Sequence, residues 1–177
     1  MPPHTAIYRR ADVPAPLMAS IDEWAHRIFI EADPSSKQIE WTGGEWLVIV
    51  CEGEQWVSSL ELLERTITVG GRPVRVGGVG GVMTHPDRRR RGYASMAMRQ
   101  AAAFMRDAMK VPFGFLVCGA SRIPFYSALG WQVVEGPCTF EQSTGRMTFP
   151  TDTVLMALAC RDDPWPGGPI DLCGPPW

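Results

Sequence analysis

Residues 82–94 place a strand end, a basic loop and a helix start next to one another. The sequence reads Val-Met-Thr-His-Pro-Asp, then four consecutive arginines, then Gly92, Tyr93 and Ala94. The first turn of a helix has backbone N–H groups without helical partners and carries the positive end of the helix dipole. Gly92 lets the backbone approach a ligand closely. This combination predicts a binding site for a phosphate or pyrophosphate group.

The arginine run also has simpler interpretations. A run of like charges is often a solvated face, and a basic patch can bind nucleic acid. The whole chain has 17 Lys and Arg against 19 Asp and Glu, a formal net charge of −2. Because nucleic-acid-binding domains are usually basic, we expect no nucleic-acid partner. The strand–loop–helix setting favours phosphate binding over a solvated face.

A second chemically interesting stretch is aromatic. Phe125 and Tyr126 precede Leu129-Gly130-Trp131, in a segment that Ser121 could begin as a helix cap. A neutral phenol can donate a proton at pH 7. Taken alone, Tyr126 is more typical of a core tyrosine whose hydroxyl reaches the surface. Its chemistry therefore depends on its neighbours.

The elements that must position these residues alternate between strands and helices. Hydrophobic patterns predict strands at residues 6–10, 46–51, 56–69, 72–84, 113–118, 131–134 and 153–160, and helices starting at residues 17, 93 and 121. A loop is predicted at residues 33–36. The order predicts an α/β fold with a mixed sheet flanked by helices and a parallel crossover between residues 79 and 117. The tail, residues 161–177, holds five prolines and three glycines, so we expect it to be irregular.

Length and composition limit the class of protein. A chain of 177 residues suits one domain over residues 1–177, and 45% hydrophobic with 20% charged residues is ordinary for a globular protein. No apolar run could span a membrane, and the first ten residues lack the apolar core of a secretory signal. The five cysteines are scattered without a C-x-x-C pair, which predicts no metal site and no disulfide framework. We expect a cytoplasmic protein without a membrane partner.

Two motifs resemble those of the GNAT superfamily, the Gcn5-related N-acetyltransferases. Arg89-x-x-Gly92-x-Ala94 is similar to the family's Q/R-x-x-G-x-G/A signature, and Phe125-Tyr126-x-x-Leu-Gly-Trp131 resembles its second motif. The motif-bearing part covers about residues 78–134. The resemblance implies the GNAT fold and an N-acetyltransferase that moves an acetyl group from acetyl-CoA to a small-molecule primary amine in a ternary complex. Many proteins of this fold are dimers, so a homodimer is a further expectation.

The resemblance also implies a role for each candidate residue. One backbone N–H on the strand before the loop would polarise the thioester carbonyl, and N–H groups of residues 90–94 would hold the pyrophosphate. Tyr126 would be the general acid that protonates the leaving CoA thiolate. The implied cofactor-binding residues are Val82, Met83, Thr84, Arg89, Arg90, Arg91, Gly92, Tyr93 and Ala94.

The tail resembles the ends of two GNAT subgroups, the aminoglycoside 2'-N-acetyltransferases and the rhizobial nodulation acyltransferases. By that resemblance the tail lies near the acceptor site, where the Trp177 carboxylate could hold the acceptor ammonium or help to remove its proton. The aminoglycoside enzymes carry a glutamate at the position that matches Gly80, so that base is missing here. Three alternatives stay open: an aminoglycoside 2'-N-acetyltransferase, a long-chain N-acyltransferase of the nodulation type, and a non-catalytic CoA-binding module.

Overall fold

The computed structural model describes residues 2–31 and 39–177, so the predicted loop at 33–36 lies outside the described residues. The strands are β1 (Pro3–Arg9), β2 (Trp46–Glu52), β3 (Gln55–Val69), β4 (Arg72–Thr84), β5 (Phe113–Gly119), β6 (Gln132–Val134), β7 (Cys138–Gln142), β8 (Gly145–Thr148), β9 (Thr153–Ala159) and β10 (Ile170–Asp171). The α-helices are α1 (Ala15–Ala25), α2 (Tyr93–Phe104) and α3 (Ile123–Ser127). Single π-helical turns at His26–Glu31 and Met105–Met109 extend α1 and α2, and 3-10 turns lie at Arg10–Asp12, Pro86–Arg88 and Ala120–Arg122.

The strands of the described residues form one mixed sheet of ten strands, which confirms the predicted fold class. β1, β2, β3 and β4 pair in antiparallel order, β4 pairs in parallel with β5, and β9 joins β5 to β6 in antiparallel pairs. The parallel β4–β5 pair is the predicted crossover, and α2 lies in the connection. The far end of β3 pairs with β10, which runs parallel to β7.

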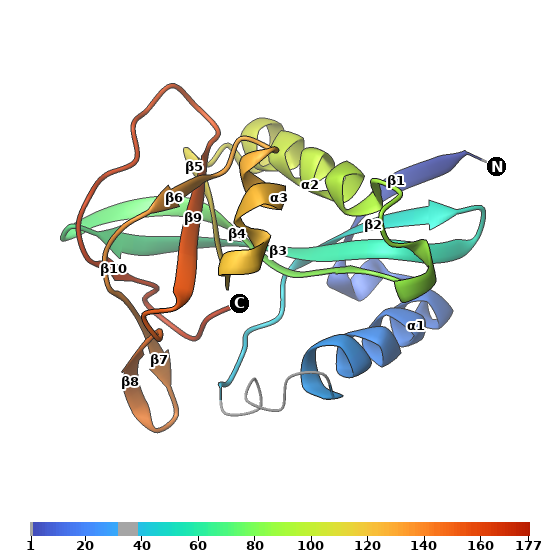
Figure 1. Ribbon diagram of the computed structural model, residues 1–177, viewed down its shortest axis with the longest axis horizontal. Coiled ribbons are helices and arrows are strands. Elements are labelled where there is room, and N and C mark those ends of the chain that lie inside the picture. The colour runs from blue at the N-terminus through green and yellow to red at the C-terminus, as the bar shows by residue number, and fades with distance from the viewer. Residues whose placement is uncertain (1, 32–38) are drawn as a thin grey trace.

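Helices cover the two faces of the sheet unequally (Figure 1). One face packs against α2 and α3, where Leu62, Val79 and Leu116 join the helix residues in the largest buried cluster. The opposite face packs against α1 around Leu47 and Ile49. Where α1 ends, the C-terminal half of the chain covers that opposite face and forms a second aromatic and aliphatic core.

That second core contains the elements that the sequence patterns did not predict. The β7–β8 hairpin was not expected, and the expectation of an irregular tail is wrong at β10 (Ile170–Asp171). Ile170 pairs with Val69 on one side and Cys138 on the other, and its side chain is 1% exposed within the second core. A two-residue strand exists only through these distant partners, so the surrounding prolines and glycines conceal it in the sequence.

Candidate functional site

The parallel strands β4 and β5 separate part of the way along their length. Residues 76–78 pair with residues 113–115, whereas β4 continues to Thr84 and β5 to Gly119 without a further described pair between them. Beyond that point the β5-facing edge of β4 offers backbone groups to another partner, because a polar backbone group inside a protein needs one. The divergence is therefore a place where an extended ligand can add to the edge of β4.

Residues 82–84 lie on this open stretch. The His85 N–H donates to the Val57 carbonyl at 2.9 Å, and the Met83 carbonyl accepts from the Ser58 hydroxyl at 2.7 Å, so both groups face β3. Successive residues of a strand direct their backbone groups to opposite edges. Of the three predicted residues, Val82 and Thr84 therefore direct theirs toward the divergence.

The loop after β4 has the shape of an anion site. Arg90 has a φ of 63° and Gly92, the residue before α2, has a φ of 84°. Alternation with left-handed residues turns successive N–H groups into one concavity, which is the usual form of a backbone anion nest. A Cβ atom on Gly92 would meet no other atom within 4 Å, so the backbone is open to a ligand on that side.

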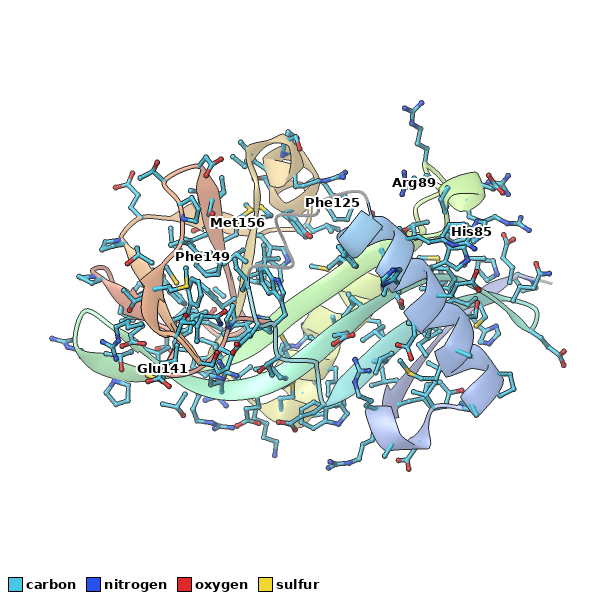
Figure 2. All side chains as sticks on the ribbon, turned by 90° about the horizontal axis from the view of Figure 1, so that it is seen from below. His85, Arg89, Phe125, Glu141, Phe149 and Met156 are labelled. Atoms are coloured by element: carbon cyan, nitrogen blue, oxygen red, sulfur yellow. The ribbon has the colours of Figure 1, made fainter. Side chains whose placement is uncertain are left out.

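The side chains around this loop supply positive charge. Arg89, Arg90 and Arg91 are exposed, and the Arg89 Nε donates to the Thr84 carbonyl at 3.4 Å. Figure 2 shows Arg89 and His85 at one end of the molecule, with Glu141 in the opposite half. The backbone and the charge together fit a pyrophosphate, the group that the sequence predicted for this segment.

Tyr126 lies on α3 in the core that faces α2. It is 7% exposed and shares a cluster with Val79, Leu116 and Trp131. Burial raises the pKa of Tyr126 to about 12, and the nearby Cys118 adds to this rise. The phenol therefore keeps its proton at neutral pH, as a general acid must.

Trp177 lies on the opposite face of the sheet. Its indole packs against Phe115 with ring centroids 6.1 Å apart, and the guanidinium of Arg65 lies 5.0 Å from the indole centroid. A Cβ atom on Gly80 would lie 2.9 Å from the Trp177 carbonyl carbon. The end of the tail is thus placed directly against β4 at Gly80.

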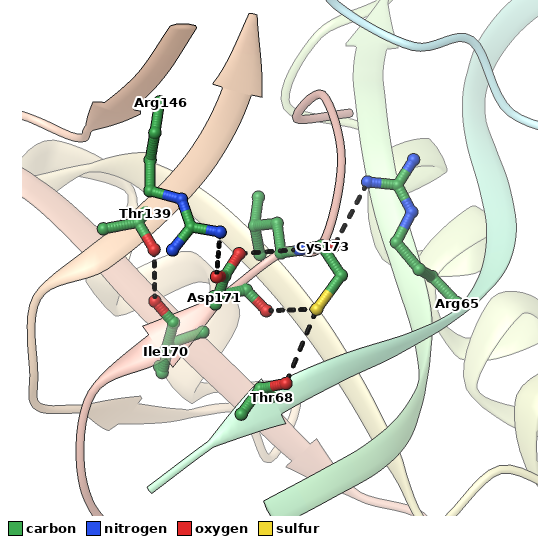
Figure 3. Close-up of polar contacts among 8 residues, drawn as sticks. Arg65, Thr68, Thr139, Arg146, Ile170, Asp171 and Cys173 are labelled. Atoms are coloured by element: carbon green, nitrogen blue, oxygen red, sulfur yellow. Dashed lines mark hydrogen bonds and ion pairs between the residues drawn. The ribbon is translucent and has the colours of Figure 1, made fainter. Parts of the chain in front are cut away.

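Backbone contacts hold the tail in this position. Arg65 donates to the Pro175 carbonyl at 2.5 Å and to the Leu172 carbonyl at 3.5 Å, and the Thr42 N–H donates to the Pro176 carbonyl at 2.7 Å. Figure 3 shows Arg65 and the residues around Asp171 that fix the preceding turn. The Asp171 carboxylate pairs with Arg146 at 3.0 Å and accepts from the Cys173 N–H at 2.9 Å.

Two glutamates near these groups were not predicted. Glu61 of β3 pairs with Gly80, and its carboxylate bonds Arg10 at 2.5 Å and the Gly44 N–H at 2.5 Å. Glu52 at the end of β2 bonds Arg88 at 3.0 Å. A charged residue inside the apolar run of residues 60–63 was a usable sequence signal for Glu61. Glu52 had no such signal, since it sits at an ordinary strand end.

The predicted donor-side residues 82–84 and 89–94 lie beyond the last pair between β4 and β5. Residues 82–84, the arginine loop and the first turn of α2 are continuous, and Tyr126 shares its buried cluster with Tyr93. Trp177 is separated from Tyr126 by the sheet, because Phe115 and Leu116 point to opposite faces. Groups on the two faces can therefore act on one ligand only where β4 and β5 have separated.

Other kinds of site find no support in the described part of the chain. No group of three or more His, Cys, Asp or Glu residues that could hold a metal ion lies within it. All five cysteines are free thiols. None of the described helices is long and apolar enough to cross a membrane.

Comparison with known proteins agrees with this arrangement. A family model described as an acetyltransferase (GNAT) domain matches residues 32–134, more than half of the chain. Because that match ends before the tail, the aminoglycoside and nodulation resemblances of the tail are not confirmed. A search of curated proteins gives no significant match.

Solved structures share the fold at low sequence identity. Escherichia coli ElaA has a TM-score of 0.63 at 11% identity, covering 88% of this chain and 99% of its own. The Escherichia coli GNAT N-acetyltransferase YhbS, in complex with CoA, has a TM-score of 0.64 at 11% identity, covering 97% and 89%. A GNAT family acetyltransferase from Brucella melitensis, in complex with acetyl-CoA, has a TM-score of 0.57 at 16% identity, covering 94% of both chains. At these identities the likeness concerns the fold, and it confirms the predicted GNAT architecture.

Proposed function

Because the chain belongs to the GNAT acetyltransferase family, we propose that it transfers an acetyl group from acetyl-CoA to a primary amine of a small-molecule acceptor. The observation that carries this proposal is the continuous unit of open β4 edge, left-handed loop and α2 start. It offers a backbone edge for an extended arm followed by a nest for a pyrophosphate. Two of the similar folds are described in complex with CoA and with acetyl-CoA.

On the donor side, this chain would bind acetyl-CoA and polarise its thioester carbonyl. The edge groups of Val82 and Thr84 would pair with the pantetheine arm, and one N–H there would stabilise the oxyanion that develops on the thioester carbonyl. Backbone N–H groups of residues 90–94 would hold the pyrophosphate, with Arg89, Arg90 and Arg91 adding positive potential. The apolar face below α2 would keep water away from the thioester.

Tyr126 would protonate the leaving thiolate. The acceptor nitrogen attacks the carbonyl carbon, the carbon–sulfur bond breaks, and the phenol gives its proton to the sulfur. The attacking amine also loses one proton to a base. Exchange with solvent then carries that proton back to the Tyr126 phenolate, so the cycle neither gains nor loses a proton. Direct transfer in a ternary complex needs no covalent enzyme intermediate.

On the acceptor side, Trp177 would line the pocket. Its indole lies directly against β4 at Gly78 and its carbonyl carbon lies against Gly80, so an amine bound beside this part of β4 would contact the end of the tail. Where the polypeptide ends at Trp177, the terminal carboxylate would stand next to Gly80 and could hold the ammonium or accept its proton. The tail, residues 161–177, is then part of the acceptor site, and the cytoplasm and a homodimer remain the proposed setting.

Calorimetric titration with acetyl-CoA, with CoA and ADP as comparison ligands, tests the donor site first. We expect micromolar binding that weakens when Arg89, Arg90 and Arg91 are changed to glutamine. An assay of thiol release then separates the alternatives. The acceptor is varied over a panel of amines that includes 2'-amino aminoglycosides, and the donor is varied from acetyl-CoA to long-chain acyl-CoA. Absence of binding to every CoA ester would contradict the proposal, and binding without release would favour a non-catalytic CoA-binding module.

A further inference from the structure

We propose that Glu52 is a positioning residue for the anion-binding loop, residues 89–92. It holds the residues at both ends of this loop and thereby sets the affinity for the donor. The inference rests on the proposed function, because the loop it holds is the proposed pyrophosphate site. Glu52 itself is not placed against the ligand. It would act through the two residues that flank the loop.

The geometry is that of a single clamp. Glu52 is the last residue of β2, Arg88 ends the 3-10 turn before the loop, and Tyr93 is the first residue of α2. One carboxylate oxygen of Glu52 accepts from Arg88 at 3.0 Å, and the other accepts from the Tyr93 hydroxyl. The four residues between these anchors, 89–92, include Arg90 and Gly92, whose positive φ values shape the nest.

Burial makes this clamp more than a surface ion pair. The side chains of Arg88 and Glu52 are 33% and 26% exposed, and Tyr93 is 6% exposed. A pair that shares its carboxylate with a buried phenol loses less freedom on forming than two long exposed side chains do. The hydrogen bond to Glu52 raises the pKa of Tyr93, so the phenol remains the donor throughout the neutral range.

The charge arrangement points the same way. A carboxylate beside a site for phosphates would oppose binding by its charge alone. Here the Glu52 carboxylate forms an ion pair with Arg88, whereas Arg89, Arg90 and Arg91 are exposed and positive. Four adjacent arginines repel one another. The ion pair between Arg88 and Glu52 of β2 offsets part of this repulsion and so lowers the free energy of the loop conformation with its left-handed residues. A loop already fixed in the binding shape loses less entropy when the ligand arrives.

The test compares Glu52→Gln and Tyr93→Phe with the wild type, using Glu64→Gln as the control. Both test changes keep the side-chain shape. Glu64 forms a similar pair with Arg75, but on the distal arm of the β3–β4 hairpin. Two readouts are measured: calorimetric affinity for acetyl-CoA and for ADP, and the rate of trypsin cleavage after residues 88–91 without ligand.

We expect Glu52→Gln to weaken both ligands by the same factor, about tenfold, since each contains the pyrophosphate. Cleavage after residues 88–91 should become several times faster, Tyr93→Phe should give a smaller change in the same direction, and Glu64→Gln should match the wild type. Unchanged or tighter binding with unchanged cleavage would overturn the inference. If the wild type bound no CoA ester, the proposed function would fail, whereas the cleavage rates would still decide whether Glu52 holds the loop.

Discussion

The indole of Trp177 occupies the space that a side chain on Gly78 would need. A Cβ atom on Gly78 would lie 2.5 Å from the indole Nε1, a distance that real Cβ contacts do not reach. The missing side chain at residue 78 is therefore what lets the tail lie flat against β4. This contact joins the last residue of the described chain to the strand that carries the proposed donor site.

Gly78→Ala should displace the tail while leaving the donor site intact. The added methyl group overlaps the indole, and overpacking of this kind costs about 1–3 kcal/mol. We expect faster hydrogen exchange in residues 172–177 and a higher KM for the acceptor amine, with calorimetric affinity for acetyl-CoA unchanged. Gly167→Ala, where a Cβ meets nothing within 4 Å, is the matched control. Normal acceptor kinetics with a displaced tail would show that Trp177 does not line the acceptor pocket.

Arg65→Lys should loosen the same tail from the other side. Arg65 bonds the carbonyls of Pro175 and Leu172 while its plane lies near the indole, and burial lowers the pKa of its guanidinium. A lysine keeps the charge but cannot reproduce the planar fork. We expect a loss of about 1–2 kcal/mol in the free energy of unfolding, read from urea melts. Arg75→Lys, which alters an exposed ion pair, should lower the free energy of unfolding far less. Equal losses in the two variants would contradict a specific role of Arg65 in holding the tail.

The sequence predicts well what depends on neighbours in the chain. The β4–loop–α2 unit, the hairpin turn at Gly70-Gly71 and the β4–β5 crossover follow from local patterns and short connections, and all three are present. β10 and the β7–β8 hairpin were not predicted, since Ile170 becomes a strand residue only through Val69 and Cys138, far away in sequence.

The site shows the same division. Residues 82–94 are contiguous, so a motif reveals them together. The placement of Trp177 against Gly78 and that of Glu52 against Arg88 and Tyr93 depend on how the sheet folds, and no spacing in the sequence encodes them. Which face each residue occupies is also hidden: Tyr126 and Trp177 were named together as catalytic candidates, yet the sheet lies between them.

Tyr126→Phe should lower turnover strongly and leave donor binding nearly intact. Loss of a general acid typically costs about 10²–10⁴-fold, and the ring itself remains packed in the core. The checks are single-turnover thiol release and calorimetry with acetyl-CoA. Phe125→Leu serves as a control for packing, because the ring centroids of Phe125 and Tyr126 lie 4.9 Å apart and Phe125 has no proton to donate. Wild-type turnover in the Tyr126 variant would end its assignment as the acid.

Gly92→Ala should weaken acetyl-CoA binding without unfolding the protein. At a φ of 84° an alanine is strained by about 1–2 kcal/mol, and its methyl group would occupy space beside the loop that no protein atom fills. We expect at least a tenfold loss of affinity. Gly71→Ala, with a φ of 79° in the distal hairpin turn, brings similar strain far from the loop. The nest would be excluded as the donor site if both variants bound acetyl-CoA equally.

Stability should fall as the pH rises above 9. Burial, with a smaller effect of Asp171, raises the pKa of Cys138 to about 12, and burial likewise raises the pKa of Tyr126 to about 12. Between the ordinary pKa values and 12 the folded state binds more protons than the unfolded state, so the free energy of unfolding decreases with pH. By pH 11 the Cys138 thiol alone should remove about 2–3 kcal/mol, while at pH 7 it contributes nothing to this slope.

Urea melts at pH 7, 9, 10 and 11 measure that slope. Cys138→Ala lowers stability at every pH by leaving a small cavity, but its curve should be flatter above pH 9 than that of the wild type. Cys173→Ala, which removes an exposed thiol, should keep the wild-type slope. Because the effect requires the Cys138 thiol to be buried in the core that it shares with Phe140, Phe149 and Ile170, parallel curves for the wild type and Cys138→Ala would mean that this core does not enclose the thiol in solution.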